Sequence, residues 1–120
     1  MSATYTGVQD MDFVYGDDVD FTVTVDVAGV TDLSSYTVVL TFTSKKDGTT
    51  FTKDSSSDTD WIDNKSTLTF DVVVDSSPTT VVSGESYTVK GHIVDGVTLH
   101  YLGSGIWRFI SPPGGALPSV

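Results

Sequence analysis

The chain has 120 residues, the length of one domain, and its hydrophobic fraction of 38% is typical of a globular protein rather than a disordered one. Sixteen acidic residues against six lysines and arginines give a net charge of −10. Such a surface repels phosphate, so we expect neither a nucleic-acid partner nor an anionic membrane as partner. Residues 1–15 lack the regions of a signal peptide, and the absence of cysteine excludes disulfides, thiolate chemistry and most zinc sites.

Three segments alternate between apolar and polar residues, and each predicts a strand with one buried face. They are residues 19–27, 36–44 and 66–74, and weaker strand candidates lie at 12–15, 49–53 and 61–63. Clusters of Gly, Asp and Ser between them are typical of turns, and no helical period is sustained. With the hairpin that follows, the pattern predicts a core of Phe21, Val23, Leu40, Phe42, Leu68, Phe70, Val89 and Ile93.

A hairpin is predicted between residues 87 and 101, and its register decides which side chains are buried. A two-residue turn at positions 95 and 96 would place the apolar residues of the two strands on opposite faces of the sheet. A three-residue loop at 94–96 places them on one face and puts a glycine where a left-handed residue is needed. We therefore expect the three-residue loop, which pairs Ile93 with Val97 and Val89 with Tyr101.

Glycines and prolines divide the remainder of the chain. Leu102-Gly103-Ser104-Gly105 is either a turn into a last strand or a bulge within one long strand, because paired glycines permit both. Residues 112–120 hold three prolines and two glycines and are typical of an extended arm. We expect an N-terminal arm at 1–9, an antiparallel, immunoglobulin-like β-sandwich at 10–111 and a C-terminal arm at 112–120.

Residues that could carry catalysis are present but not in a catalytic pattern. His92 and His100 are expected on the solvent face, and a zinc site would need further ligands. Ser104 lies between two glycines, but the segment is not the five-residue nucleophile elbow. We therefore expect no enzymatic activity and no cofactor, since catalysis depends on the geometry of a site and not on the mere presence of suitable residue types.

Calcium is the better inorganic candidate. Asp58, Asp60 and Asp63 offer alternating oxygen donors, and residues 17–20 hold a second group of aspartates. Neither group has the glycine and glutamate spacing of the helix–loop–helix calcium loop. We expect both to be solvated acidic loops, with no bound metal.

Aromatic and apolar residues near the C-terminus indicate a binding surface. Alternation in 106–110 places Trp107 and Phe109 on one face and bulky residues on the other, so this strand is buried on both sides or exposes a patch. Trp61 lies in a polar loop. That these rings cap the ends of the sandwich remains an equal alternative. The interface candidates are Trp61, Trp107, Phe109, Pro112, Pro113 and Leu117.

Turn and strand-entry segments follow one another in a characteristic order: Gly16-Asp17, Asp32-Leu33-Ser34-Ser35-Tyr36, Lys46-Asp47-Gly48, Val82-Ser83-Gly84-Glu85-Ser86-Tyr87, Asp95-Gly96 and Leu102-Gly103-Ser104-Gly105. This order resembles that of small β-sandwich proteins of tailed bacteriophages. Over about residues 10 to 111 the chain is similar to the amino-terminal domain of phage baseplate upper proteins and to short virion accessory proteins. The resemblance implies an immunoglobulin-like sandwich that attaches to other virion proteins and has no catalytic residues.

These observations favour a structural protein of the virion, assembled in the host cytoplasm. We expect a head decoration (cement) protein that binds the major capsid protein on the outer capsid surface, because packaged DNA would repel a negative protein inside. A tail or baseplate attachment module remains an alternative, and a homo-oligomer is possible. From another class, a carbohydrate-binding module would use Trp61, Tyr101 or Trp107 as a stacking platform. We expect both arms to lie across a neighbouring subunit.

Overall fold

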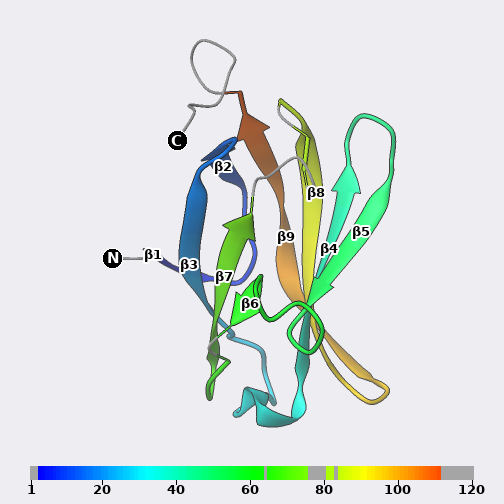
Figure 1. Cartoon of the computed structure of the whole chain (residues 1–120). Coiled ribbons are helices and arrows are strands. Elements are labelled where there is room, and N and C mark those ends of the chain that lie inside the picture. Colours follow the sequence, from blue (N-terminus) through cyan, green and yellow to red (C-terminus); the bar gives the residue numbers. More distant parts are fainter. Residues whose placement is uncertain (1–2, 64, 76–80, 83, 112–120) are drawn as a thin grey trace.

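The computed structural model describes residues 3–63, 65–75, 81–82 and 84–111, and this part of the chain is all-β (Figure 1). No helix in it is long and apolar enough to cross a membrane. Its nine strands and one short 3-10 helix are, in order, β1 (Ala3–Thr6), β2 (Met11–Val14), β3 (Asp18–Thr24), η1 (Leu33–Ser35), β4 (Thr37–Ser44), β5 (Thr50–Asp54), β6 (Ile62–Asp63), β7 (Thr69–Asp75), β8 (Ser86–Asp95) and β9 (Thr98–Ile110).

Two sheets pack face to face (Figure 1). The four-stranded sheet has the order β1-β3-β7-β6 and the five-stranded sheet the order β2-β9-β8-β4-β5. Both sheets are mixed, because β1 runs parallel to β3 and β2 runs parallel to β9. The expectation of a wholly antiparallel sandwich is therefore wrong. All other strand pairs are antiparallel, as expected.

The core lies between the sheets and is built from the residues that the alternation predicted. Of the eight residues expected there, seven are buried, and Leu68 is partly buried against the same cluster. The indole of Trp107 is central, with its ring centroid 5.4 to 5.8 Å from those of Phe13, Phe21 and Phe42. Edge-to-face packing of this kind stabilises aromatic clusters beyond the area that the rings bury.

The register of the β8–β9 hairpin differs from the one we expected. Asp95 lies opposite Thr98, so the turn consists of Gly96 and Val97, and Ile93 lies opposite His100. Neither loop considered from the sequence is formed, and Leu99 and Tyr101 point outward instead of into the core. The hairpin end therefore exposes apolar side chains, and Figure 1 shows it projecting beyond β4 and β5.

The position of the turn accounts for the outward Leu99 and Tyr101, and a bulge sets the faces of the rest of β9. The register shifts between Gly91 and His92, so Leu102 is an extra residue on β9, which is one long strand rather than two. Gly103 has a φ of 106°, which favours glycine, and a Cβ there would lie 2.8 Å from the Val8 carbonyl oxygen. The bulge reverses the parity of β9, so that Leu102, Trp107 and Phe109 all face the core.

The N-terminal residues belong to the sandwich rather than to an arm. Residues 3–6 pair with β3, and Tyr5 lies edge-to-face on Phe21 with 5.6 Å between centroids. Gly7 and Val8 then cross to the other sheet, where the Val8 N–H donates to the Leu102 carbonyl at 2.9 Å. The described part of the expected arm at 1–9 is thus folded onto its own domain, because Tyr5 and Val8 bury apolar surface there. The expected arm at 112–120 lies outside the described residues.

Candidate interaction surface

The three aromatic interface candidates in the described part of the chain are core residues. Trp61 and Trp107 are 1% exposed and Phe109 is 0% exposed. The expectation that they form a surface patch is wrong, because the bulge in β9 directs Trp107 and Phe109 inward and the loop before β6 folds Trp61 against Phe42. Pro112, Pro113 and Leu117 lie outside the described residues.

The exposed apolar side chains gather on the outer face of the five-stranded sheet instead. We call this surface the β9 face; it comprises the outward side chains of β2, β9, β8, β4 and β5. Of the seven large apolar residues exposed in the described part, five lie on it: Val14 (40%), Leu99 (60%), Tyr101 (55%), Ile106 (38%) and Ile110 (47%). Four of these belong to β9 and form a stripe along the longest strand, interrupted by Ser104 and Arg108.

The rest of the β9 face is rich in threonine. Ile106 lies opposite Thr88, which lies opposite Thr43 and then Thr50 across the sheet. In the neighbouring row Ser104, Lys90, Thr41 and Thr52 follow one another in the same way. This composition results from the alternation read in the sequence, since threonine favours strands and tolerates solvent.

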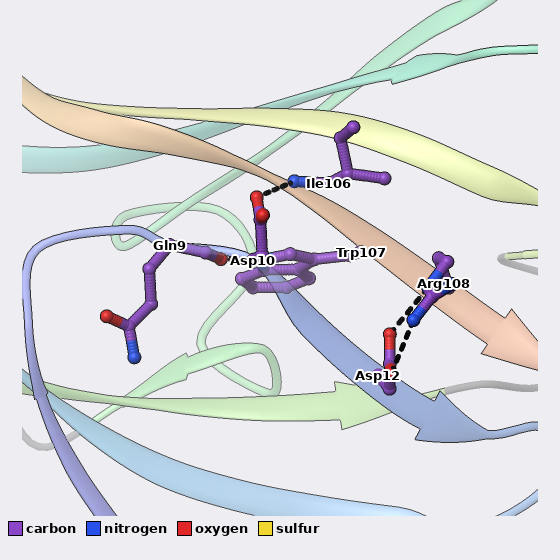
Figure 2. A network of polar contacts seen from close by, with 6 residues as sticks. All are labelled: Gln9, Asp10, Asp12, Ile106, Trp107 and Arg108. Atoms are coloured by element: carbon purple, nitrogen blue, oxygen red, sulfur yellow. Dashed lines mark hydrogen bonds and ion pairs between the residues drawn. The ribbon is translucent and has the colours of Figure 1, made fainter.

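Two carboxylates of the N-terminal segment fix one end of the stripe (Figure 2). Arg108 donates from Nε and from a terminal nitrogen to the two oxygens of Asp12, each at 2.7 Å. Asp10 accepts a hydrogen bond of 2.9 Å from the backbone N–H of Ile106. The hydrogen bond from Arg108 lowers the pKa of the Asp12 carboxyl below its ordinary value. An open depression of about 380 Å³ lies here, lined by Asp10, Met11, Asp12, Ile106 and Arg108.

The opposite outer face of the molecule is acidic. On the four-stranded sheet, Asp20, Asp63 and Asp71 point outward, and Asp63 lies opposite Asp71 in the register. Thr22 donates from its hydroxyl to Asp71 at 2.7 Å. No lysine or arginine occurs at the strand positions described for this sheet. The two outer faces therefore differ in character: one is acidic, and the other combines apolar, neutral polar and nearly balanced charged groups.

The residues weighed for catalysis are not gathered into a site. His92 lies beside the Tyr101 ring and His100 beside the Tyr36 ring, at centroid distances of 5.5 and 5.9 Å. These two histidines point to opposite faces of the β8–β9 hairpin, since His92 pairs with Tyr101 and His100 with Ile93. Ser104 is exposed opposite Lys90. In the described part of the chain, these residues do not form a pair of nucleophile and general base.

Asp58, one of the aspartates considered for calcium, lies in a loop that hydrogen bonds to Asp54 and Asp58 hold in place. Asp54 accepts hydrogen bonds from the backbone N–H groups of Ser56 and Ser57, and the hydroxyl of Ser56 also donates to it, which lowers the pKa of its carboxyl. Asp58 accepts from the Asp54 N–H at 3.0 Å and lies 3.8 Å from the Lys53 ammonium. Among the described residues, no three acidic or histidine side chains gather as metal ligands would.

Comparison with known proteins adds no functional evidence to that of the β9 face. No protein-family model matches the chain, and no curated protein matches its sequence. The strand at 106–110 and its alternation are as the sequence predicts, but the two interface candidates on it, Trp107 and Phe109, face the core. The polar character of Asp12, Arg108 and Ser86 indicates which side of this strand meets solvent, since these residues form one row across the outer side of the sheet.

Proposed function

We propose that the chain is a non-enzymatic structural protein of a tailed-phage virion, an immunoglobulin-like sandwich that works by protein–protein contact through its β9 face. The clustering of exposed apolar side chains on that face, opposite an acidic face, is the observation that carries this proposal. Single exposed apolar residues are ordinary on protein surfaces, whereas a contiguous group rimmed by polar residues is typical of a binding surface. The phage assignment itself rests on the sequence resemblance.

The immunoglobulin-like assignment is supported by strand order and by one tyrosine. In immunoglobulin sandwiches, a tyrosine at the start of the sixth strand hydrogen-bonds back to the chain a few residues upstream. Here Tyr87, at the start of β8, accepts a hydrogen bond of 3.1 Å from the N–H of Val82. The orders β1-β3-β7-β6 and β2-β9-β8-β4-β5 fit the two sheets of a variable-type domain. The parallel β1–β3 pair is a departure from that pattern.

Placement on the outside of the particle is supported by charge. A net charge of −10 opposes contact with packaged DNA. We therefore propose a head decoration protein on the outer capsid surface, with attachment to the tail or baseplate as the alternative location. The carbohydrate-binding alternative loses support, because Trp61 and Trp107 are buried and Tyr101 alone of the three rings is exposed.

The proposal is tested by incorporation of variants into virions. Ile106→Lys places a charge on the apolar stripe of the β9 face, and Val82→Lys makes the same kind of change at a residue that is 58% exposed elsewhere. We expect the first variant to be depleted from purified particles at least about tenfold, because a charge in a buried interface is costly, and the second to be incorporated normally. Equal incorporation of both folded variants would overturn the role of the β9 face. Absence of the wild-type chain from purified heads and tails would overturn the virion assignment.

A further inference from the structure

The sequence contains two Asp-Gly pairs, and both lie in exposed turns: Asp47-Gly48 between β4 and β5, and Asp95-Gly96 at the end of the β8–β9 hairpin. We propose that the second pair is a site of spontaneous covalent modification, where Asp95 closes onto the Gly96 nitrogen as a cyclic imide and reopens in part as isoaspartate. The first pair has the same two residues, but hydrogen bonds in its turn protect it. This inference does not depend on the proposed function.

The reaction needs only the two residues and water. Glycine after aspartate offers the least hindrance, because it has no side chain beside the attacking nitrogen. The Gly96 nitrogen forms a bond to Cγ of Asp95, and the carboxyl hydroxyl leaves with the amide proton as water. Water then opens the imide: cleavage of the new N–Cγ bond restores aspartate, whereas cleavage of the original peptide bond leaves the main chain running through Cγ. No oxidant, reductant or cofactor is consumed.

The reacting groups at the hairpin end are not held by hydrogen bonds. Asp95 and Gly96 are both exposed, and Gly96 lies beyond the strand ladder, which ends at the pair of Asp95 and Thr98. Among the residues that the structure describes, the Gly96 N–H donates to no acceptor and the Asp95 carboxylate accepts no hydrogen bond. A Cβ at Gly96 would meet no atom within 4 Å, so the space around the turn is open. The Gly96 nitrogen and the Asp95 carboxyl are therefore free to approach each other.

The turn at Asp47-Gly48 holds the same two groups in hydrogen bonds. The Gly48 N–H donates to the Ser44 carbonyl oxygen at 2.9 Å, and the Thr49 N–H donates to the Asp47 carboxylate at 2.9 Å. Hydrogen bonds from Thr49 lower the pKa of the Asp47 carboxyl, so less of it is in the protonated form that loses water. Each hydrogen bond that must open before the reaction lowers the reactive population about fivefold. Since Asp47 and Gly48 are exposed as well, hydrogen bonding rather than burial protects them.

The modification changes the geometry of the hairpin, because isoaspartate lengthens the main chain by one carbon atom. Asp95 and Thr98 form the last pair of the β8–β9 ladder, and only Gly96 and Val97 lie between them. A two-residue turn fixes the register of its hairpin, so the added atom disrupts that pair. Val97 is fully exposed and has no packing that would restore it. We therefore expect isoaspartate at position 95 to open the end of the hairpin and to leave the rest of β9 paired.

Incubation of the full chain in heavy-oxygen water near neutral pH tests the inference, because each imide that forms and reopens leaves one heavy oxygen at that residue. Trypsin, used afterwards in ordinary water, places Asp47 in the peptide 47–53 and Asp95 in the peptide 91–108. We expect the label to accumulate at Asp95 at least about fivefold faster than at Asp47, and electron-transfer fragmentation to locate isoaspartate at position 95. Equal rates at the two sites, or a faster rate at Asp47, would overturn the inference.

Two controls separate the effect of structure from that of sequence. In urea the hydrogen bonds at Asp47 are lost, so the two rates should come within about twofold of each other. A ratio that persists in urea would assign the difference to neighbouring residues and contradict the protection by the turn. Asp95→Ser alters an exposed side chain and should abolish labelling in the peptide 91–108. Label that remains in that peptide would show that Asp95 is not the reacting residue.

Discussion

The indole nitrogen of Trp107 donates a hydrogen bond of 2.9 Å to the backbone carbonyl oxygen of Gln9, which precedes β2 (Figure 2). This bond joins the centre of the core to the segment that forms the rim of the β9 face. The Asp10 carboxylate adds a second bond in the same place, to the N–H of Ile106. The position of the edge strand β2, and with it Asp12, therefore depends on a buried side chain.

Replacing Trp107 by phenylalanine should destabilise the domain by about 3 kcal/mol. The change leaves the Gln9 carbonyl without its donor and leaves a gap beside Phe13 and Phe42. Urea unfolding measures the loss, and amide exchange should show β2 opening more readily than β4. A loss below about 1 kcal/mol would show that the indole does not hold β2.

Gly105→Ala should displace β2 from β9. A Cβ at position 105 would overlap the backbone of Gln9 and Asp10, so the two segments could not keep their present separation. We expect a loss of about 3 kcal/mol in urea unfolding, as for overpacked positions. Ser104→Ala is the control, because Ser104 is exposed on the adjacent position, and it should change stability by less than about 0.5 kcal/mol. Equal effects of the two substitutions would contradict the close approach.

Much of the sandwich follows from alternation, but its N-terminal part does not. The buried face of a strand can be predicted where apolar and polar residues alternate over several positions, because one side of the sheet meets solvent. This holds for residues 19–27, 36–44 and 66–74. β1 has only four residues, and its docking depends on a turn at Gly7 and on Tyr5 meeting Phe21. Such contacts join distant parts of the chain, so no local pattern predicts them.

The candidate surface was misassigned for a related reason. Alternation at 106–110 separates Trp107 and Phe109 from Ile106, Arg108 and Ile110, but does not say which set faces the core. The insertion of Leu102 at the bulge decides that, together with the approach of Val8 to Gly103. One extra residue reverses every side chain beyond it. Leu99 and Tyr101 were expected inside for a different reason, the three-residue loop at 94–96, whereas the turn consists of Gly96 and Val97.

Tyr87→Phe should cost about 1 kcal/mol, the usual contribution of one hydrogen bond. The phenol oxygen accepts from the Val82 N–H, while the ring remains packed against Phe51 and Phe109. Tyr101→Phe removes a hydroxyl from a ring that is 55% exposed, and it should leave the urea midpoint unchanged. If both variants behave alike, the Tyr87 hydroxyl does not tie the 81–82 segment to β8.

The Asp12–Arg108 pair should be visible in the pH dependence of stability. Because the hydrogen bond from Arg108 lowers the pKa of the folded Asp12 carboxyl, its stabilisation is present above the unfolded pKa of about 3.9 and is lost as pH falls through the folded value. In Arg108→Gln the Asp12 pKa, measured by NMR of the carboxyl carbon, should rise. Asp47, whose pKa is lowered by hydrogen bonds from Thr49, is the internal control and should not change. An unchanged Asp12 titration would contradict the pair in solution.

The most direct test of the β9 face uses the absence of cysteine from the chain, which allows single thiols to be introduced. Ser104→Cys lies on the β9 face and Thr4→Cys on the outer face of the other sheet, and both parent residues are exposed. Their rates of reaction with a maleimide are compared between dilute free protein and purified virions that carry each variant. The account predicts that assembly slows labelling at position 104 at least about tenfold and leaves position 4 unchanged, because only a covered surface excludes the reagent. Equal labelling at both positions, or protection at position 4 alone, would contradict it.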